Sequence, residues 1–410
     1  MRDQGRAERD RRPDGTGPLL IAGDPTAPLR RDIRQLGTIL GIVLVEQEGE
    51  WLLELVERIR RDARAARHDG HVVEVDAALG AREQALVLRA FGLYFQLANL
   101  AEQHHRLRRR REDASSGRPA RESLAAAFDQ LDGVLDDRAH GTSIRLVLTA
   151  HPTETTRRTV LLGHIRISEE LRLLDDPRVS PEERRAHEAR IAEEVTLLWQ
   201  TDEVRHDGLR ISDEIRNGLW FFEHSLLAAA TDLVEEWRER LPGSPPPIAF
   251  GSWIGGDMDG NPSAGPASID EALARAHTLA LERYRAEVRE LAVQISPARS
   301  LVEISDELEA SLARDERELS GYAAEIGSRN QLEPYRRKLS FMWWRLGNEG
   351  YDGADELLED LQTIRRSLAE NGGGRVAAGR VARLERMVEI FGFHIAKLDV
   401  RLHARELGTD

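Results

Sequence analysis

The chain has 410 residues, 40% of them hydrophobic and 32% charged, which is enough for two or three domains with a sizeable core beneath a solvated surface. Its formal charge of −14 argues against a general nucleic-acid binder, and it means that an anionic substrate must be attracted by a local cluster of arginines. The absence of cysteine excludes disulfides, thiol nucleophiles and cysteine-bound zinc, while the lack of a long apolar run or an apolar signal sequence predicts a soluble cytoplasmic protein that does not enter a membrane.

The chain begins with a polar segment and continues with long helical patterns. Residues 1–28 are rich in Arg, Asp, Gly and Pro, which predicts a disordered tail. From Leu29 onward apolar residues recur at helical spacing, and we predict an amino-terminal helical region over residues 29–140. The clearest helical patterns, with approximate bounds, cover residues 80–111, 159–175, 181–200, 213–240, 267–295, 301–320 and 331–347.

Three short segments between these helices are typical of strands. They are Ser143–Thr149, Ile248–Trp253 and Phe393–Val400. Strands separated by helical crossovers predict a parallel sheet, and in a β/α barrel of parallel strands the chemistry lies at the carboxyl ends. His151, Asp257 and Arg401 fall at or just after such ends.

The first candidate site surrounds His151. Pro152 suits the first position of a helix, so His151 would lie between a strand end and a helix start. A helix amino terminus disfavours a charged imidazolium, which favours a neutral imidazole able to act as a base, and its N–H groups can meet an anion. Arg157 and Arg158 follow about one turn later and could face the same place. Alternatively, His151 caps a helix and both arginines are solvated.

The second candidate is the glycine-rich segment 251–262, GSWIGGDMDGNP. Its glycines predict a tight loop that can bring backbone close to a small ligand. The alternating acidic and amide side chains hint at a calcium loop, but Pro262 and Ser268 stand where that motif requires Gly and Glu, so we discount calcium. A turn stabilised by aspartate, without a ligand, is the alternative.

Two further patterns are weaker. Arg401 at the end of the third strand is suited to a bidentate grip on phosphate, although an arginine in an ion pair is commoner. The acidic and Arg side chains of segments 199–205 and 213–222 recur at helical spacing, which favours structural ion pairs over a site.

Together these segments resemble the bacterial type of phosphoenolpyruvate carboxylase. The stretch VLTAHPTETTRRTV around His151 is similar to the family's signature at its catalytic histidine. Further blocks that look like the family's are LWQTDEVR, FGSWIGGDMDGNP, EPYRRKLSFMWWRL and LDVR, and the helical starts LRRDIRQLGTILGIVLVEQEGEWLLELVERIR and FQLANLAEQHHRLRRRR. The likeness covers nearly everything from Leu29 to the end.

The resemblance implies a mostly α-helical protein with α/β barrel elements, a helix-rich elaboration of an eight-stranded TIM-type β/α barrel. Residues 141–410 would then be the first part of that barrel with helical insertions. The implied reaction joins phosphoenolpyruvate and bicarbonate to give oxaloacetate and phosphate, with Mg²⁺ or Mn²⁺, through carboxyphosphate and the enolate of pyruvate. Members of the family usually assemble as tetramers.

The resemblance also assigns roles to residues. His151 matches the histidine that acts as a base toward the carboxyl proton of carboxyphosphate, Arg401 matches an arginine that holds the substrate phosphate, and Trp253 lies in the loop associated with bicarbonate. We add Arg157 and Arg158 as substrate-binding candidates because of their place after His151. Met258 departs from the family, which commonly has Arg there.

Length is the larger departure. The chain stops at Asp410, roughly halfway through a family member, so we expect it to be incomplete and, by itself, inactive. The metal ligands and the catalytic lysine are expected in the missing carboxyl half, and none is assigned to this chain. The alternative is an inactive remnant that acts as an interaction or regulatory subunit.

Overall fold

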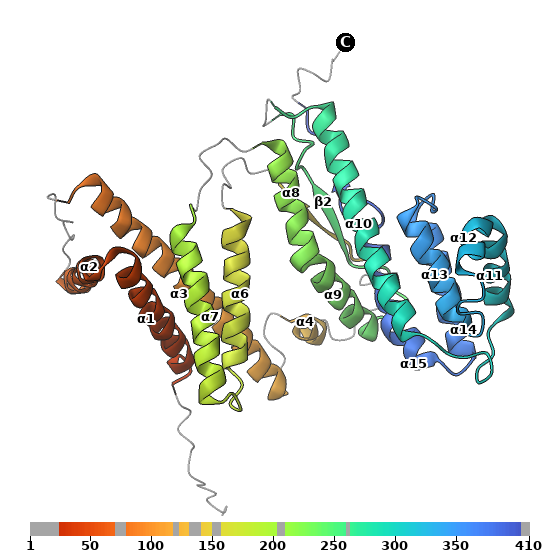
Figure 1. The fold of residues 1–410 in the computed structure, drawn as a ribbon, viewed down its shortest axis with the longest axis horizontal. Coiled ribbons are helices and arrows are strands. Elements are labelled where there is room, and N and C mark those ends of the chain that lie inside the picture. The colour runs from red at the N-terminus through yellow and green to blue at the C-terminus, as the bar shows by residue number, and fades with distance from the viewer. Residues whose placement is uncertain are drawn as a thin grey trace, which may run out of the picture. The chain divides into compact units, whose positions relative to one another are not determined.

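The computed structural model describes residues 24–69, 79–117, 123–130, 141–149, 157–202, 210–259 and 263–402 (Figure 1). The chain divides into two compact units. One comprises Met1–Arg118 with Arg157–Glu203, and the other Pro119–Thr156 with Val204–Asp410. The described residues are mostly helical and contain one small parallel sheet, which agrees with the predicted fold class at that level.

The first unit consists of long amphipathic helices packed on one apolar core. Its described helices are α1 (Ala27–Glu48), α2 (Glu50–Asp69), α3 (Ala81–Ser115), α6 (Arg158–Leu174) and α7 (Pro181–Gln200). Leu36 of α1, Leu97 of α3 and Ile167 of α6 are among the buried side chains of this core. The start of α7 is encoded locally, because the Ser180 hydroxyl accepts a hydrogen bond from the Glu183 N–H while the Glu183 carboxylate accepts one from the Ser180 N–H.

The predicted domain boundaries agree only in part with the two compact units. Of the predicted tail 1–28, residues 1–23 lie outside the described residues, and α1 already begins at Ala27. Helices α6 and α7 follow the boundary predicted at residue 140, yet they pack against α1 and α3. Residues 131–140 lie outside the described residues, so the boundary itself stays a prediction.

The second unit contains the sheet and the remaining helices. Its described helices, in chain order, are α4 (Leu124–Gln130), α8 (Ile211–Phe221), η1 (Phe222–Leu226), α9 (Leu227–Arg240), α10 (Pro266–Gln294), α11 (Asp306–Glu318), α12 (Ser320–Ile326), α13 (Pro334–Gly347), α14 (Ala354–Glu370), α15 (Gly374–Val376), η2 (Ala377–Val381) and α16 (Ala382–Phe391). The predicted helix over 213–240 is thus one rod with a π-helical turn, η1, in its middle. Helices α10 and α13 lie side by side (Figure 1).

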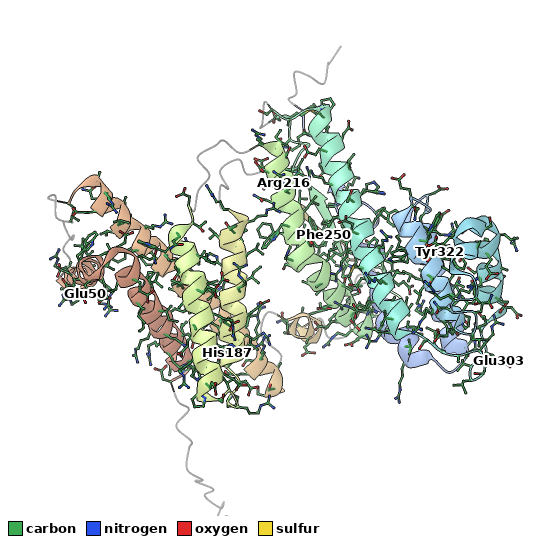
Figure 2. All side chains as sticks on the ribbon, viewed as in Figure 1. Glu50, His187, Arg216, Phe250, Glu303 and Tyr322 are labelled. Carbon is green, nitrogen blue, oxygen red and sulfur yellow. The ribbon has the colours of Figure 1, made fainter. Side chains whose placement is uncertain are left out.

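The sheet has three parallel strands in the order β1 (Ile144–Leu148), β2 (Ile248–Ser252) and β3 (Lys397–Leu398). Ile144 pairs with Ile248, and the register continues to Leu148 and Ser252. Phe250, labelled in Figure 2, lies in the core, where its ring stacks on that of Phe391 with centroids 5.3 Å apart. Both strand pairs are parallel, as predicted. The eight-stranded barrel remains a prediction.

The third strand is much shorter than predicted, and the prediction over residues 393–400 was wrong at its start. Helix α16 ends at Phe391, and the Ile395 N–H still donates to the Phe391 carbonyl oxygen at 2.9 Å. Ile395 has a left-handed backbone with φ 63°, which is incompatible with an extended strand. The apolar side chains of Phe393 and Ile395 are therefore buried by a turn, and only Lys397 and Leu398 form the strand.

Candidate active site at the strand ends

The carboxyl ends of the three strands are joined by backbone hydrogen bonds. The Trp253 N–H, just after β2, donates to the Leu148 carbonyl oxygen at the end of β1 over 2.8 Å. The Asp399 N–H, just after β3, donates to the Ser252 carbonyl oxygen over 2.9 Å. The segments that follow β2 and β3 consequently begin at the same edge of the sheet, as parallel strands require.

The loop after β2 then runs alongside the segment after β3. The Arg401 N–H donates to the Gly256 carbonyl oxygen at 2.9 Å, and the Met258 N–H donates to the Arg401 carbonyl oxygen at 3.0 Å. Gly256 permits this approach, because a Cβ atom there would lie 2.6 Å from the Asp399 carbonyl oxygen. Gly256 therefore allows a close contact between two backbone segments, whereas the sequence pattern had led us to expect a close contact with a ligand.

Arg401 lies at the centre of this contact. Its guanidinium carbon is 4.1 Å from the centre of the Trp253 ring, and its Nη1 is 3.2 Å from the Asp257 Oδ2. Its Nη2 is 3.9 Å from the Asp259 Oδ2. The side chain of Arg401 is 39% exposed, whereas that of Asp257 is only 11% exposed. The arginine thus forms the ion pair that we had considered as an alternative, and part of its side chain is still exposed to solvent.

Glu214 is a site residue that the sequence reading did not single out. It lies in the first turn of α8 and is 9% exposed. Burial raises the pKa of its carboxyl, and the charge of Asp257 raises it further. Its neighbour Asp213 instead pairs with Arg216 one turn later, which confirms the predicted structural ion pair in this segment (Arg216 is labelled in Figure 2).

His151, the predicted base, lies outside the described residues, as does the helix start predicted at Pro152. The described chain resumes at Arg157, which precedes the first residue of α6, Arg158. Arg157 Nε is buried without a hydrogen-bond partner among the described residues. Both arginines belong to the first unit, and Trp253 and Arg401 belong to the second. Of the predicted site residues, the structure therefore brings together Trp253 and Arg401.

The part of the chain that the structure describes contains neither a cluster of metal ligands nor a membrane-spanning helix. Among these residues, no three His, Asp or Glu side chains gather as a metal site would need. None of the described helices combines the length and the apolar character that crossing a bilayer requires. The described strand ends offer an arginine, an indole ring and carboxylates, and of these groups the Arg401 guanidinium is the one suited to gripping an oxyanion.

Comparison with known proteins identifies a family that matches most of this chain. The family described as phosphoenolpyruvate carboxylase matches residues 29–408. A phosphoenolpyruvate carboxylase of Azoarcus sp. (strain BH72) is 35% identical over 92% of this chain and 45% of its own length. A phosphoenolpyruvate carboxylase of Nocardia farcinica (strain IFM 10152) is 36% identical over 92% of this chain and 44% of its own length. A phosphoenolpyruvate carboxylase of Roseiflexus castenholzii (strain DSM 13941 / HLO8) is 34% identical, also over 92% of this chain and 44% of its own length. The chain spans less than half the length of these curated relatives.

Proposed function

The chain belongs to the phosphoenolpyruvate carboxylase family, and we propose that it forms the amino-terminal part of an active site that carboxylates phosphoenolpyruvate with bicarbonate to give oxaloacetate and phosphate. The observation that carries this proposal is Arg401. It lies at the carboxyl ends of parallel strands, stacks on Trp253 and keeps an exposed edge. That is the arrangement expected for a cation that grips a phosphoryl group.

The proposed chemistry divides between residues of this chain. Arg401 holds the phosphoryl group of phosphoenolpyruvate, so that bicarbonate can attack the phosphorus and release the pyruvate enolate. The carboxyphosphate formed in this step gives up its carboxyl proton to His151, releasing phosphate and the carbon dioxide that the enolate captures. Trp253 forms a wall of the bicarbonate pocket, and Arg157 and Arg158 add positive charge for the anions. Fixed cations and a neutral base meet the needs of two anionic substrates.

The required Mg²⁺ or Mn²⁺ does not fit the described residues, because they hold no cluster of metal ligands. We place its ligands in the part of the longer relatives that this chain does not span. A bound divalent cation would neutralise charge that develops on the enolate and phosphate oxygens. We further propose that the complete enzyme is a cytoplasmic homotetramer, which binds neither nucleic acid nor membrane.

A second candidate function follows from the share of the relatives that the chain covers, 44–45%. A chain of this extent can serve as an inactive remnant that binds a partner or regulates it. Both proposals predict that the chain alone, given phosphoenolpyruvate, bicarbonate and Mg²⁺, makes no oxaloacetate. They differ in what happens when the carboxyl portion of a relative is added.

The experiment is a complementation assay. The chain is mixed with the separately expressed carboxyl portion of the Azoarcus relative, and oxaloacetate is measured by its reduction with malate dehydrogenase. Restored turnover supports the enzyme, and a complex that forms without turnover supports the remnant. In the restored enzyme, His151→Asn should abolish turnover with phosphoenolpyruvate binding largely intact, while Arg401→Gln should weaken that binding. A silent His151→Asn variant would remove the proposed base.

A further inference from the structure

We propose that the two aspartates of the loop after β2 have opposite effects on the anion site: Asp257 positions Arg401, and Asp259 competes with the incoming phosphoryl group. This inference rests on the proposed function, because it concerns the same arginine. It assigns a positioning residue and a competing residue to carboxylates that lie two residues apart and carry the same charge.

Asp257 is built to hold Arg401 in place. Its side chain is 11% exposed, and its Oδ2 lies 3.2 Å from Arg401 Nη1. The backbone around it cannot move independently of the arginine, because Gly256 and Met258 on either side are hydrogen-bonded to the backbone of Arg401. A buried carboxylate on a backbone tied at both neighbours has little freedom to leave, so it fixes one edge of the guanidinium.

Trp253 supplies the second constraint. With the guanidinium carbon 4.1 Å from the ring centre, the indole covers one face of the planar group. A guanidinium held on one face and at Nη1 keeps its Nη2 in a fixed position, 3.9 Å from the Asp259 Oδ2. A phosphoryl group gripped by two parallel N–H bonds needs such a fixed plane, because a freely rotating arginine loses rotamer entropy when it binds.

Asp259 stands at the edge that remains. Its Oδ2 is 3.9 Å from Nη2, too far for a hydrogen bond, and its side chain is 38% exposed. A carboxylate at this distance attracts the arginine weakly and repels an anion that approaches the same nitrogen. A phosphoryl group must therefore bind against the charge of Asp259, whereas the contact at Asp257 can persist beneath it.

The two roles can be separated because the same substitution, Asp to Asn, should change anion binding in opposite directions at the two positions. Asp257→Asn and Asp259→Asn each remove one negative charge and keep the shape of the side chain. If only the local charge mattered, both variants would bind an anion more tightly. With Asp257 as a positioning residue, Asp257→Asn should bind more weakly despite the gained positive charge, and only Asp259→Asn should bind more tightly.

The test is calorimetric titration of the full chain with phosphoenolpyruvate and with inorganic phosphate at low ionic strength. We expect the dissociation constant to rise about fivefold in Asp257→Asn and to fall about two- to threefold in Asp259→Asn. Higher salt should shrink the gain in Asp259→Asn, because that side chain is exposed to screening. Tighter binding by both variants, or no change in either, would overturn the assignment.

A second readout keeps the inference testable if the wild-type chain binds neither anion, a result that would count against the proposed function. Rotation of the Arg401 guanidinium about its Cζ–Nε bond is measured by nitrogen-15 NMR, with the signal assigned through Arg401→Gln. Rotation should be slow in the wild type and in Asp259→Asn, and at least severalfold faster in Asp257→Asn. Equal rates in all three would contradict the positioning role even without a ligand.

Discussion

The guanidinium carbon of Arg401 lies 4.1 Å from the centre of the Trp253 ring, although the two residues are 148 positions apart in the chain. The contact exists because β2 and β3 are parallel and adjacent, so that the segments following them leave the sheet at the same edge. It turns a loop tryptophan and a strand-end arginine into one rigid surface. The contribution of this contact to phosphoenolpyruvate binding can be tested by removing the Trp253 ring.

Trp253→Leu should loosen Arg401 and weaken phosphoenolpyruvate binding about two- to fivefold, since an exposed cation–π contact contributes about 0.5–1 kcal/mol. Trp253→Phe, which keeps an aromatic face, should retain part of the affinity. Trp343→Leu is the matched control, because Arg285 of α10 lies over that ring of α13 at 4.0 Å, and neither residue belongs to the segments that follow the strands. Equal losses in Trp253→Leu and Trp343→Leu would show a general effect on the unit rather than on the site.

Gly256→Ala should separate the loop after β2 from the segment after β3. The added Cβ atom would lie 2.6 Å from the Asp399 carbonyl oxygen, and that backbone is itself hydrogen-bonded to Ser252. We expect a loss of about 1–3 kcal/mol in the free energy of unfolding, measured by denaturant titration. Gly379→Ala, in a helical segment with nothing within 4 Å, should be neutral or slightly stabilising. A Gly256→Ala chain as stable as the wild type would contradict the described contact.

Glu214 should make the second unit less stable as the pH rises. Its pKa is raised above the ordinary value of 4.5, so the folded state binds its proton more tightly than the unfolded state does. The free energy of unfolding therefore falls as the pH rises from 4.5 to the folded-state pKa, and it stays at the lower level above that pKa, where the buried carboxyl is ionised. Glu214→Gln should therefore melt at a higher temperature than the wild type at pH 8.

The same difference should disappear below pH 4, where Glu214 is protonated in both states. Glu239→Gln, at an exposed position near the end of α9, controls for the lost charge. Differential scanning calorimetry of the three chains between about pH 3 and pH 8 measures the effect. A Glu214→Gln variant that is less stable than the wild type at pH 8 would show that the ionised carboxyl is stabilising.

Lys338 should be essential for the stability of the second unit. It is 1% exposed, and its Nζ lies 2.7 Å from Asp315 and 2.6 Å from Asp360. Burial raises the pKa of Asp315 in spite of the attraction of Lys338, so the network is already strained by desolvation. Lys338→Met removes the cation that Asp315 and Asp360 share and leaves Asp315 with only the Arg345 guanidinium, 3.0 Å away, among the cations that the described contacts show. The variant should lower the free energy of unfolding by about 3–5 kcal/mol.

Arg366→Met provides the contrast. Its ion pair with Glu307 joins side chains that are 42% and 49% exposed. Such pairs contribute up to about 1 kcal/mol, so the variant should unfold close to the wild type in urea. Similar losses in Lys338→Met and Arg366→Met would mean that the buried network has no special role.

The helices were predictable because their signal is local. Leu36, Leu40 and Val43 recur at helical spacing, and all three are buried on one face of α1. The helix α14 carries the same signal in Leu357, Leu361 and Ile364, although we did not predict a helix there. The sequence therefore contains the information for α14, and our prediction was wrong in omitting this helix.

The site was predictable only in part. The motifs placed Trp253 and Arg401 at strand ends, but their contact depends on the pairing of β2 with β3, which no local pattern contains. Glu214 was missed because an acid in the first turn of a helix is common and normally solvated. Its burial beside Asp257 depends on how α8 packs near the strand ends, so only the folded chain reveals it.

The central claim is that the strand-end site of the second unit receives the phosphoryl group of phosphoenolpyruvate. Phosphorus-31 NMR tests it most directly, because the phosphoenolpyruvate signal broadens and shifts even when binding is weak. We predict a saturable change with the wild-type chain, its retention in Arg366→Gln, and its loss in Arg401→Gln. An unchanged titration in Arg401→Gln would contradict the account.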